Sequence, residues 1–344
     1  MSDLLHLQTA ACGRPSPATI DAVRQHLELE AAEGGYVAEE QAAPRLRRLK
    51  AGVGRLLGHD ADAVCFTTSA TDGLEQLLRR WPLPEDADVL VAAGEWGPNR
   101  DRFLAHGLRV RTAAVDAHGR LDLAELQREL RIDPPALVHL VSLASHRALA
   151  QPVAEALRLC GEAGVPLWVD AAQALAHLPT GFGADAVYAP ARKWLAAPRG
   201  VGFLAVAAPW RDRFSGLDDE ECSVASRVGA AQALAELPTD HVDRLAAVGR
   251  RLREAVADVE GWEVADPPGA TGALVGLRPT ADQDVEAVQR RLHQEHRVLT
   301  TACLTWRAPD DMAEPLLRLA PAELAEADVE RLTGSLRLRK PSLG

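Results

Sequence analysis

The stretch from Val165 to Phe203 decides the fold and reads VPLWVDAAQALAHLPTGFGADAVYAPARKWLAAPRGVGF. It opens with a buried-strand pattern, Leu167-Trp168-Val169, which ends on Asp170. A second apolar run, Ala186-Val187-Tyr188, leads to Lys193. In an open α/β sheet, ligands bind outside the carboxyl ends of the strands, so this carboxylate and this amine indicate a binding site. Taken singly, each residue is also compatible with an ordinary acidic loop residue or a surface lysine.

Strands and helices alternate along the chain from residue 60 to residue 206. Ala136–Leu143 is almost entirely apolar, as is typical of a strand that is buried on both faces of a parallel sheet. The alternation predicts an α/β fold with a mostly parallel sheet and helices on both faces. A long helix is expected over Pro238–Val259, and from Trp262 onward the pattern becomes that of a smaller α+β domain. We expect a large domain at residues 16–237 and a small domain formed by residues 1–15 and 238–344.

Composition agrees with an enzyme of the cytoplasm. The chain has 344 residues, 47% of them hydrophobic, and a net charge of −11 without any basic run, so nucleic acid is not an expected partner. No apolar stretch approaches the ~20 residues of a membrane span, and Met1-Ser2-Asp3 does not begin a signal peptide. Five cysteines without C-x-x-C spacing predict neither a disulfide framework nor a metal site.

A strand over Val64–Thr68 runs into the small residues Ser69, Ala70 and Thr71 and then into a helix. A strand, a tight turn and a helix start present free backbone N–H groups and the positive end of the helix dipole, which suits a phosphate. An ordinary turn with a Ser or Thr cap gives the same pattern.

Three further residues follow predicted strands and are candidates for the cleft. Trp96 comes shortly after the strand Asp88–Ala92 and offers a large aromatic face to the cleft, unless it packs beneath a loop. Ser145 and His146 follow the buried strand Ala136–Leu143. Polar side chains just past a buried strand are expected to point at the cleft.

Together these motifs resemble the class V aminotransferase-like pyridoxal-phosphate enzymes of fold type I, from about Leu7 to Leu336. The resemblance implies a mostly parallel seven-stranded sheet and a bound pyridoxal 5′-phosphate. Lys193 would form a Schiff base with the cofactor, Asp170 would pair with the protonated pyridine nitrogen, and Gln173 would reach the phenolic oxygen.

The resemblance also implies roles for the other candidates. Residues Ala70 and Thr71 would hold the phosphate, Trp96 would stack on the pyridine ring, and Ser145 or His146 would lie near the phenolic oxygen. Arg318 would bind the substrate carboxylate, which a planar guanidinium grips in bidentate fashion. A solvated arginine at a sheet edge is the alternative. A homodimer with a shared active site is expected, in which Arg227-Val228-Gly229 resembles a segment that closes the neighbouring site.

The sequence departs from the family pattern near the phosphate. Ser69 stands where the family has Gly, Pro190 and Ala191 stand where Ser or Thr precedes the lysine, and Ala230 stands where a Thr is usual. Two outcomes are open: Arg192 takes over the missing phosphate contact, or the cofactor is held more weakly.

Several stretches, such as Glu33-Gly34-Gly35-Tyr36 and Arg192-Lys193-Trp194, resemble the bacterial ergothioneine-biosynthesis C–S lyases, a branch of this family. The resemblance implies β-elimination from a small cysteine sulfoxide conjugate, hercynylcysteine sulfoxide, to ergothioneine, pyruvate and ammonia. We expect Tyr36 and Trp306 to border the cleft and to face the trimethylammonium group of this substrate.

Two other functions remain open at this point. A cysteine desulfurase would need a nucleophilic cysteine on a mobile loop, and Cys303 precedes Arg318 at a reminiscent spacing. A half-buried strand cysteine explains Cys303 as well. The other possibility is a catalytically inactive relative that keeps the fold as a binding module.

Overall fold

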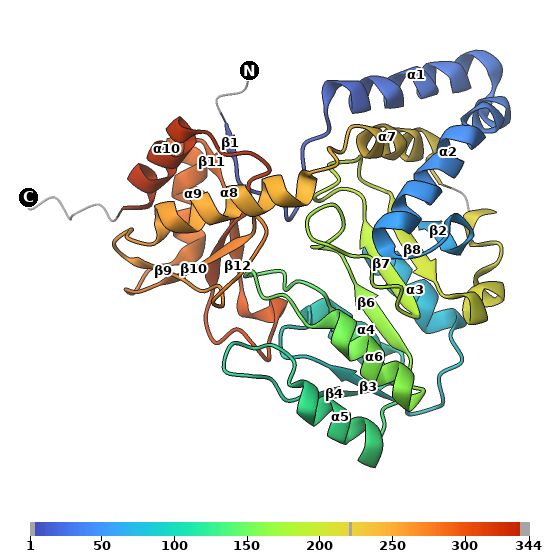
Figure 1. The fold of residues 1–344 in the computed structure, drawn as a ribbon. Coiled ribbons are helices and arrows are strands. Elements are labelled where there is room, and N and C mark those ends of the chain that lie inside the picture. The colour runs from blue at the N-terminus through green and yellow to red at the C-terminus, as the bar shows by residue number, and fades with distance from the viewer. Residues whose placement is uncertain (1–3, 220–221, 338–344) are drawn as a thin grey trace, which may run out of the picture.

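The computed structural model describes residues 4–219 and 222–337, and Figure 1 shows its fold. A seven-stranded sheet forms the centre of the larger part, in the order β2-β8-β7-β6-β5-β3-β4. Its strands are β2 (Val64–Thr67), β3 (Asp88–Val91), β4 (Arg109–Thr112), β5 (Leu137–Val141), β6 (Leu167–Asp170), β7 (Ala186–Pro190) and β8 (Gly202–Val206). Strand β8 runs antiparallel to both of its neighbours and the other pairs are parallel, which confirms the predicted mostly parallel sheet.

Helices cover both faces of this sheet, as predicted. Side chains alternate between the faces along each strand, so that Val187 packs in the core beneath α2, α5 and α6, whereas its neighbour Tyr188 packs in the core beneath α3 and α4. The bounds of these helices are α2 (Gly35–Leu57), α3 (Ala70–Arg80), α4 (Gly97–Ala105), α5 (Leu123–Ile132) and α6 (Val153–Ala163). Helix α4 was not expected from the sequence, although Pro98 in its first turn favours a helix start.

Helices α1 (Pro17–Glu33) and α2 form a hairpin at one edge of the molecule, seen at the upper right of Figure 1. Ser16 caps α1, because its side chain accepts a hydrogen bond from the backbone N–H of Thr19. Helix α2 begins at Gly35. Helix α7 (Val224–Ala235) packs against both helices of the hairpin.

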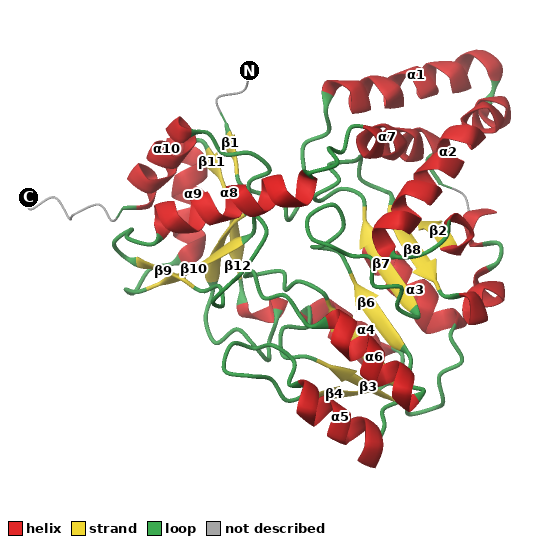
Figure 2. Ribbon diagram, viewed as in Figure 1, coloured by secondary structure: helices red, strands yellow, loops and turns green. Residues whose placement is uncertain are grey.

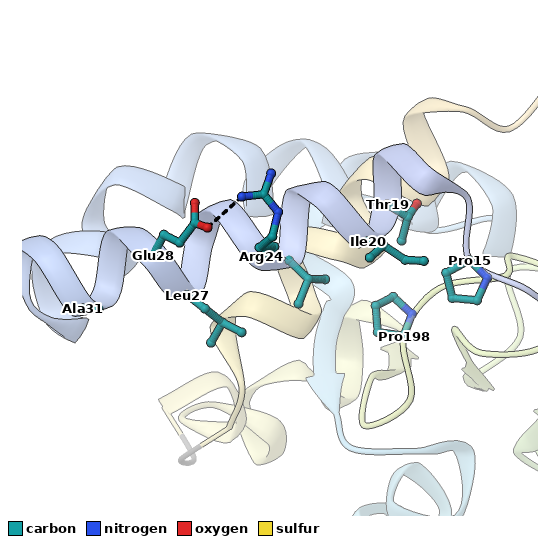
Figure 3. Close-up of a pocket in the computed structure, with 9 residues that line it drawn as sticks. Pro15, Thr19, Ile20, Arg24, Leu27, Glu28, Ala31 and Pro198 are labelled. Atoms are coloured by element: carbon teal, nitrogen blue, oxygen red, sulfur yellow. Dashed lines mark hydrogen bonds and ion pairs between the residues drawn. The ribbon is translucent and has the colours of Figure 1, made fainter.

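The outer side of α1 carries an apolar groove of about 570 Å³ (Figure 3). Ile20 and Leu27, which are 58% and 51% exposed, line it together with Pro15 and Pro198.

The smaller part of the molecule contains a four-stranded antiparallel sheet, in the order β12-β13-β10-β9, as the yellow strands at the left of Figure 2 show. Strand β1 pairs in parallel with β11, so the first strand of the chain lies against the last third of it. The elements here are β1 (Leu5–His6), α8 (His241–Val256), β9 (Trp262–Val264), β10 (Val275–Pro279), α9 (Val285–His296), β11 (Val298–Leu299), β12 (Thr301–Cys303), β13 (Leu316–Leu319) and α10 (Glu326–Leu336).

Short 3-10 helices occupy some of the connections. The segment after β8 contains η2 (Ala208–Phe214) and η3 (Leu217–Asp219), whose Phe214 and Leu217 are buried against the sheet. The remaining two are η1 (Ala61–Ala63) and η4 (Thr305–Arg307). Within residues 4–219 and 222–337, no helix is long and apolar enough to cross a membrane.

Candidate active site

A cavity of about 250 Å³ lies at the carboxyl ends of β6 and β7. Residues of the seven-stranded sheet and of the four-stranded sheet border it. Ten of the predicted site residues line it: Ala70, Thr71, Trp96, Ser145, Asp170, Gln173, Arg192, Lys193, Trp306 and Arg318. The carboxylate and the amine that follow neighbouring strands in the sequence therefore meet at one cavity.

The structure corrects the positions of two predicted residues. Tyr36 lies in the first turn of α2, is 91% exposed and does not border this cavity. His146 is completely buried and turns away from the cavity, with its Nε2 at 2.6 Å from Oδ2 of Asp311. Arg147 shares the same carboxylate. Burial outweighs this pairing and lowers the pKa of His146. The pair joins the segment after β5 to the segment before β13.

Lys193 is the one lysine among the described residues that line the cavity. The chain contains only three lysines, at positions 50, 193 and 340. Removal from water lowers the pKa of Lys193 to about 7; the nearby Asp170 raises it, and Arg192 and Arg318 lower it further. A substantial fraction of Lys193 is therefore the unprotonated, nucleophilic amine at neutral pH.

The cavity favours anionic ligands. Among the described residues that line it, Arg192, Lys193, Arg307 and Arg318 carry or can carry positive charge, whereas Asp170 is the one carboxylate. Arg318 is 1% exposed, and its Nη1 donates to the carbonyl oxygen of Ser145 at 2.5 Å. Burial lowers the pKa of Arg318 to about 10. Excess positive charge of this kind suits a phosphate and a carboxylate.

The start of α3 adds backbone donors to the same cavity. Ser69 caps the helix by accepting from the N–H of Asp72 at 3.0 Å, and the next N–H groups, of Ala70 and Thr71, have no partner within a helix. Ser69 has an extended backbone, with φ of −167°, so this position does not require the glycine that the family usually has. The close approach of the Ser69 backbone to β8 depends instead on Gly202, where a Cβ would lie 2.6 Å from the backbone carbon of Ser69.

Asp170 and Gln173 are held in fixed orientations. Asp170 is 3% exposed and accepts from the N–H of Ala172 at 2.8 Å and from Nδ2 of Asn99 at 2.9 Å. The Gln173 amide donates to the carbonyl oxygen of Ala10 at 2.9 Å and accepts from the indole N–H of Trp194 at 3.0 Å. Asn99 and Trp194 were not predicted as site residues; Asn99 lies in α4, which the sequence analysis did not anticipate.

The residues present fit pyridoxal phosphate. Buried polar atoms of four cavity residues have no hydrogen-bond partner within the described residues: Nε1 of Trp96, Oγ of Ser145, Nε of Arg307 and Nε of Arg318. Such atoms indicate a polar ligand. Lys193 would hold the aldehyde carbon, Asp170 would accept from the pyridine nitrogen, and the start of α3 with Arg192 would hold the phosphate.

Cys303 does not belong to the cavity lining. It is fully buried in β12 and packs in an apolar cluster with Met312 and Leu316. This environment is that of a structural core cysteine and differs from the exposed, mobile loop that a persulfide-forming nucleophile would need.

Comparison with known proteins agrees with this geometry. The model of the aminotransferase class-V family matches residues 5–217. A probable hercynylcysteine sulfoxide lyase of Mycobacterium tuberculosis is 40% identical over 92% of this chain and 85% of its own length. Two solved structures share the fold with TM-scores of 0.85: a cysteine desulfurase of Thermococcus onnurineus, at 15% identity over 96% of this chain and 93% of its own, and a C-DES mutant with glycine linked to its PLP cofactor, at 16% identity over 97% and 96%. The chain belongs to the class V aminotransferase family of pyridoxal-phosphate enzymes.

Proposed function

We propose that this chain is a carbon–sulfur lyase that cleaves hercynylcysteine sulfoxide by β-elimination. The observation that carries the proposal is the 40% identity to a probable enzyme of this kind along nearly the whole chain. The cavity supports it with an amine, a carboxylate and an arginine in the places that this chemistry needs. The sulfur fragment leaves as a sulfenate, which a thiol reductant converts to ergothioneine, and the remaining fragment hydrolyses to pyruvate and ammonia.

Each residue has a distinct task in this reaction. Bound pyridoxal phosphate supplies an electron sink for the negative charge that develops at the substrate α-carbon. Arg318 binds the substrate carboxylate and so orients the α-proton. The Nζ of Lys193, with its pKa near 7, removes that proton as a general base. Asp170 keeps a proton on the pyridine nitrogen by accepting its hydrogen bond.

Three further features belong to the same proposal. The molecule is divided into a large domain (16–237) and a small domain (1–15 and 238–344). It acts in the cytoplasm on a small-molecule cysteine conjugate. It functions as a homodimer, in which a second copy covers the apolar groove on α1; the exposure of Ile20 and Leu27 supports this. Arg227, by contrast, is buried within its own chain, with its guanidinium 4.5 Å from the ring centre of Phe66.

A cysteine desulfurase is the second candidate, because a solved desulfurase shares the fold. The burial of Cys303 in an apolar cluster speaks against it. The third candidate is a binding module without catalytic activity. A desolvated lysine beside Asp170 speaks against it, because binding alone does not require such a group.

Product analysis separates these candidates. The purified, cofactor-loaded protein is incubated with hercynylcysteine sulfoxide and, in parallel, with cysteine. The proposal expects one pyruvate for each sulfoxide consumed. Alanine and sulfide from cysteine would establish a desulfurase, and no turnover of either compound by fully loaded protein would establish a binding relative.

A further inference from the structure

Among the described residues that line the cavity, Arg307 is the one cation to which the proposed reaction gives no task. Arg192 is assigned to the cofactor phosphate, Lys193 to the aldehyde carbon and the α-proton, and Arg318 to the substrate carboxylate. The Nε of Arg307 is buried and has no hydrogen-bond partner within the described residues. The nearest carboxylate along the chain, that of Asp310, is paired elsewhere. Because an arginine keeps its charge in proteins, this side chain is suited to an anionic group of a ligand.

The 3-10 helix η4 fixes the backbone of Arg307 and of its neighbour Trp306 at the cavity wall. The N–H of Arg307 donates to the carbonyl oxygen of Leu304 at 3.0 Å. The carbonyl group of Trp306 packs on Gly97 so closely that a Cβ at this glycine would clash with it. Ala308, which follows η4, is completely buried in an apolar cluster. A fixed backbone reduces the ordering that ligand binding must bring about, so the two side chains are preorganised.

The side chains of Trp306 and Arg307 form an adjacent pair of different character. The guanidinium carbon of Arg307 lies 5.0 Å from the centre of the Trp306 ring. The tryptophan is 50% exposed, so part of its aromatic surface stays uncovered. A guanidinium donates in bidentate fashion to a carboxylate, and an aromatic face attracts a quaternary ammonium group. The pair therefore matches a betaine, in which a carboxylate and a trimethylammonium group are attached to one carbon.

Electrostatic effects indicate that Arg307 lies on the substrate side of the cavity. Burial is the main cause that lowers the pKa of Arg318, and Arg307 lowers it further by more than Arg192 does. Burial is also the main cause that lowers the pKa of Lys193, and here Arg307 contributes less than Arg192 or Arg318. Coulomb effects weaken with distance. Arg307 is thus placed near the residue that holds the amino-acid end and farther from the reacting carbon, as a contact to a remote substrate group requires.

We propose that Arg307 binds a second carboxylate of the substrate, the one on the hercynyl betaine, while Trp306 faces the trimethylammonium group beside it. The identity of this carboxylate rests on the proposed function, whereas the place for it rests on the cavity alone. Arg318 and Arg307 then hold opposite ends of one substrate molecule. Arg307 is a specificity-determining residue with no part in proton transfer, and it makes the cavity selective for cysteine conjugates that carry a distal carboxylate.

Amino acids without a leaving group test the contact in the absence of turnover. The probes are α-aminoadipate, α-aminopimelate and α-aminosuberate, which carry the distal carboxylate at increasing distance. Each is compared with the amino acid that has a methyl group in place of that carboxylate. Titration calorimetry on cofactor-loaded protein measures the affinities. In the wild type, at least one dicarboxylate should bind roughly tenfold more tightly than its neutral counterpart, the size expected for hydrogen bonds between charged groups.

Arg307→Gln should remove this preference and leave the affinity of the neutral compound within about twofold of the wild type. Arg307→Lys is a second variant: it keeps the charge but lacks the planar fork, so the preference should fall without disappearing. Equal affinities within every pair in the wild type would overturn the inference. A preference that is unchanged in both variants would also overturn it.

Arg100→Gln is the matched control. Arg100 pairs with Asp310 and does not line the cavity, so this substitution removes a positive charge close to η4 without touching the proposed contact. The preference for the dicarboxylate should stay as in the wild type. If it fell as much as in Arg307→Gln, long-range attraction and not contact would be responsible.

Hercynylcysteine sulfoxide connects the inference to the proposed function. For this compound, Arg307→Gln should lower kcat/KM roughly tenfold, whereas a simple S-alkyl cysteine sulfoxide should lose no more than about twofold. Equal losses would place Arg307 at a group that both compounds share, such as the sulfoxide oxygen, and the inference would be wrong. If the wild type does not cleave hercynylcysteine sulfoxide, the proposed function fails, while the amino-acid pairs still decide whether Arg307 binds a second carboxylate.

Discussion

The imidazole of His177 lies flat on the indole of Trp194, with ring centroids 3.6 Å apart and planes at 16°. Burial lowers the pKa of His177 to about 3, so this ring is neutral. Its Nδ1 donates to the carbonyl oxygen of Gln173, and its Nε2 accepts from the N–H of Ala273 at 2.7 Å. The stack and the hydrogen bond from Ala273 thus connect the segment before β10 to Gln173 and Trp194 at the cavity.

Trp194 determines which way the Gln173 amide points, and this gives the first prediction. The indole N–H engages the amide oxygen and the amide nitrogen donates one hydrogen to Ala10, so its second hydrogen is left to donate toward the cofactor. Trp194→Phe keeps an aromatic ring on His177 but leaves a buried oxygen unsatisfied, at a cost of about 1–3 kcal/mol. We expect a lower free energy of unfolding in urea and weaker binding of pyridoxal phosphate.

Trp168→Phe is the matched control. Trp168 is fully buried on β6 and its indole nitrogen has no hydrogen-bond partner among the described residues, so this substitution removes the same atoms without breaking a bond. Cofactor affinity should stay within about twofold of the wild type. Identical losses of affinity in both variants would show that ring volume, and not the hydrogen bond, matters.

Covalent capture of the cofactor is expected at Lys193 alone. The purified protein should be yellow, and borohydride reduction followed by peptide mapping should find the label on this lysine. Lys193→Ala should abolish labelling. Lys50→Arg should not affect it, because Lys50 pairs with Asp218 away from the cavity and arginine preserves that charge. Label on another lysine of the wild type would contradict the site.

The pKa of Lys193 predicts how fast the cofactor binds to cofactor-free protein at different pH. Only the unprotonated amine attacks the aldehyde, and the pKa is lowered to about 7, so the rate should rise with pH through about 7 and level off above it. Asp170 raises this pKa, and Asp170→Asn should therefore move the midpoint to lower pH. Stopped-flow absorbance measures both; a midpoint that moves upward in the variant would refute the assignment.

Cys303 is expected to be dispensable for catalysis. Cys303→Ala removes a buried sulfur from the cluster around Met312 and should lower stability modestly, by about 1 kcal/mol. Pyruvate formation at saturating cofactor should remain close to that of the wild type. If the variant binds cofactor normally but loses turnover, and the wild type converts cysteine to alanine, the desulfurase alternative is correct.

The central site could be predicted from the sequence because its residues follow strands directly. Asp170 and Lys193 each come at or just past a buried strand, and in a parallel sheet such ends lie along one edge. The strand pattern alone was therefore enough to predict that these two residues lie close together.

Residues whose position depends on a reversal of the chain were harder to place. The pair Gly34-Gly35 signals a break, and Gly34 has a φ of +92° that ends α1, but the sequence does not say where the resulting hairpin points. Tyr36 follows that turn and lies outside the cavity. The hydrogen bonds of His139 were missed for a related reason: they join residues 95, 139 and 188, which only the arrangement of the strands in the sheet brings together. The one signal was a single polar residue in an otherwise apolar strand.

The last prediction concerns recognition of the betaine group of hercynylcysteine sulfoxide. A trimethylammonium group has no N–H to donate, and aromatic faces hold such cations with about 0.5–2 kcal/mol each. Trp306 borders the cavity and is 50% exposed, so it has surface left for a ligand. Its backbone is packed onto the start of α4, where Gly97 leaves no room for a Cβ. The guanidinium carbon of Arg307 lies 5.0 Å from the centre of the Trp306 ring, so Arg307 covers part of the indole surface.

Trp306→Leu keeps an apolar side chain and removes the aromatic face. For hercynylcysteine sulfoxide, kcat/KM should fall roughly threefold to thirtyfold, the range that corresponds to this energy. A simple S-alkyl cysteine sulfoxide has no betaine and should lose far less, because Arg318 still binds the amino-acid end that both compounds share. Tyr36→Leu is the comparison: a selective loss there would mean that a second copy of the chain brings Tyr36 to the cavity, and no change would leave Trp306 as the aromatic contact. Equal losses for both substrates in Trp306→Leu would show that the indole only supports the cavity wall.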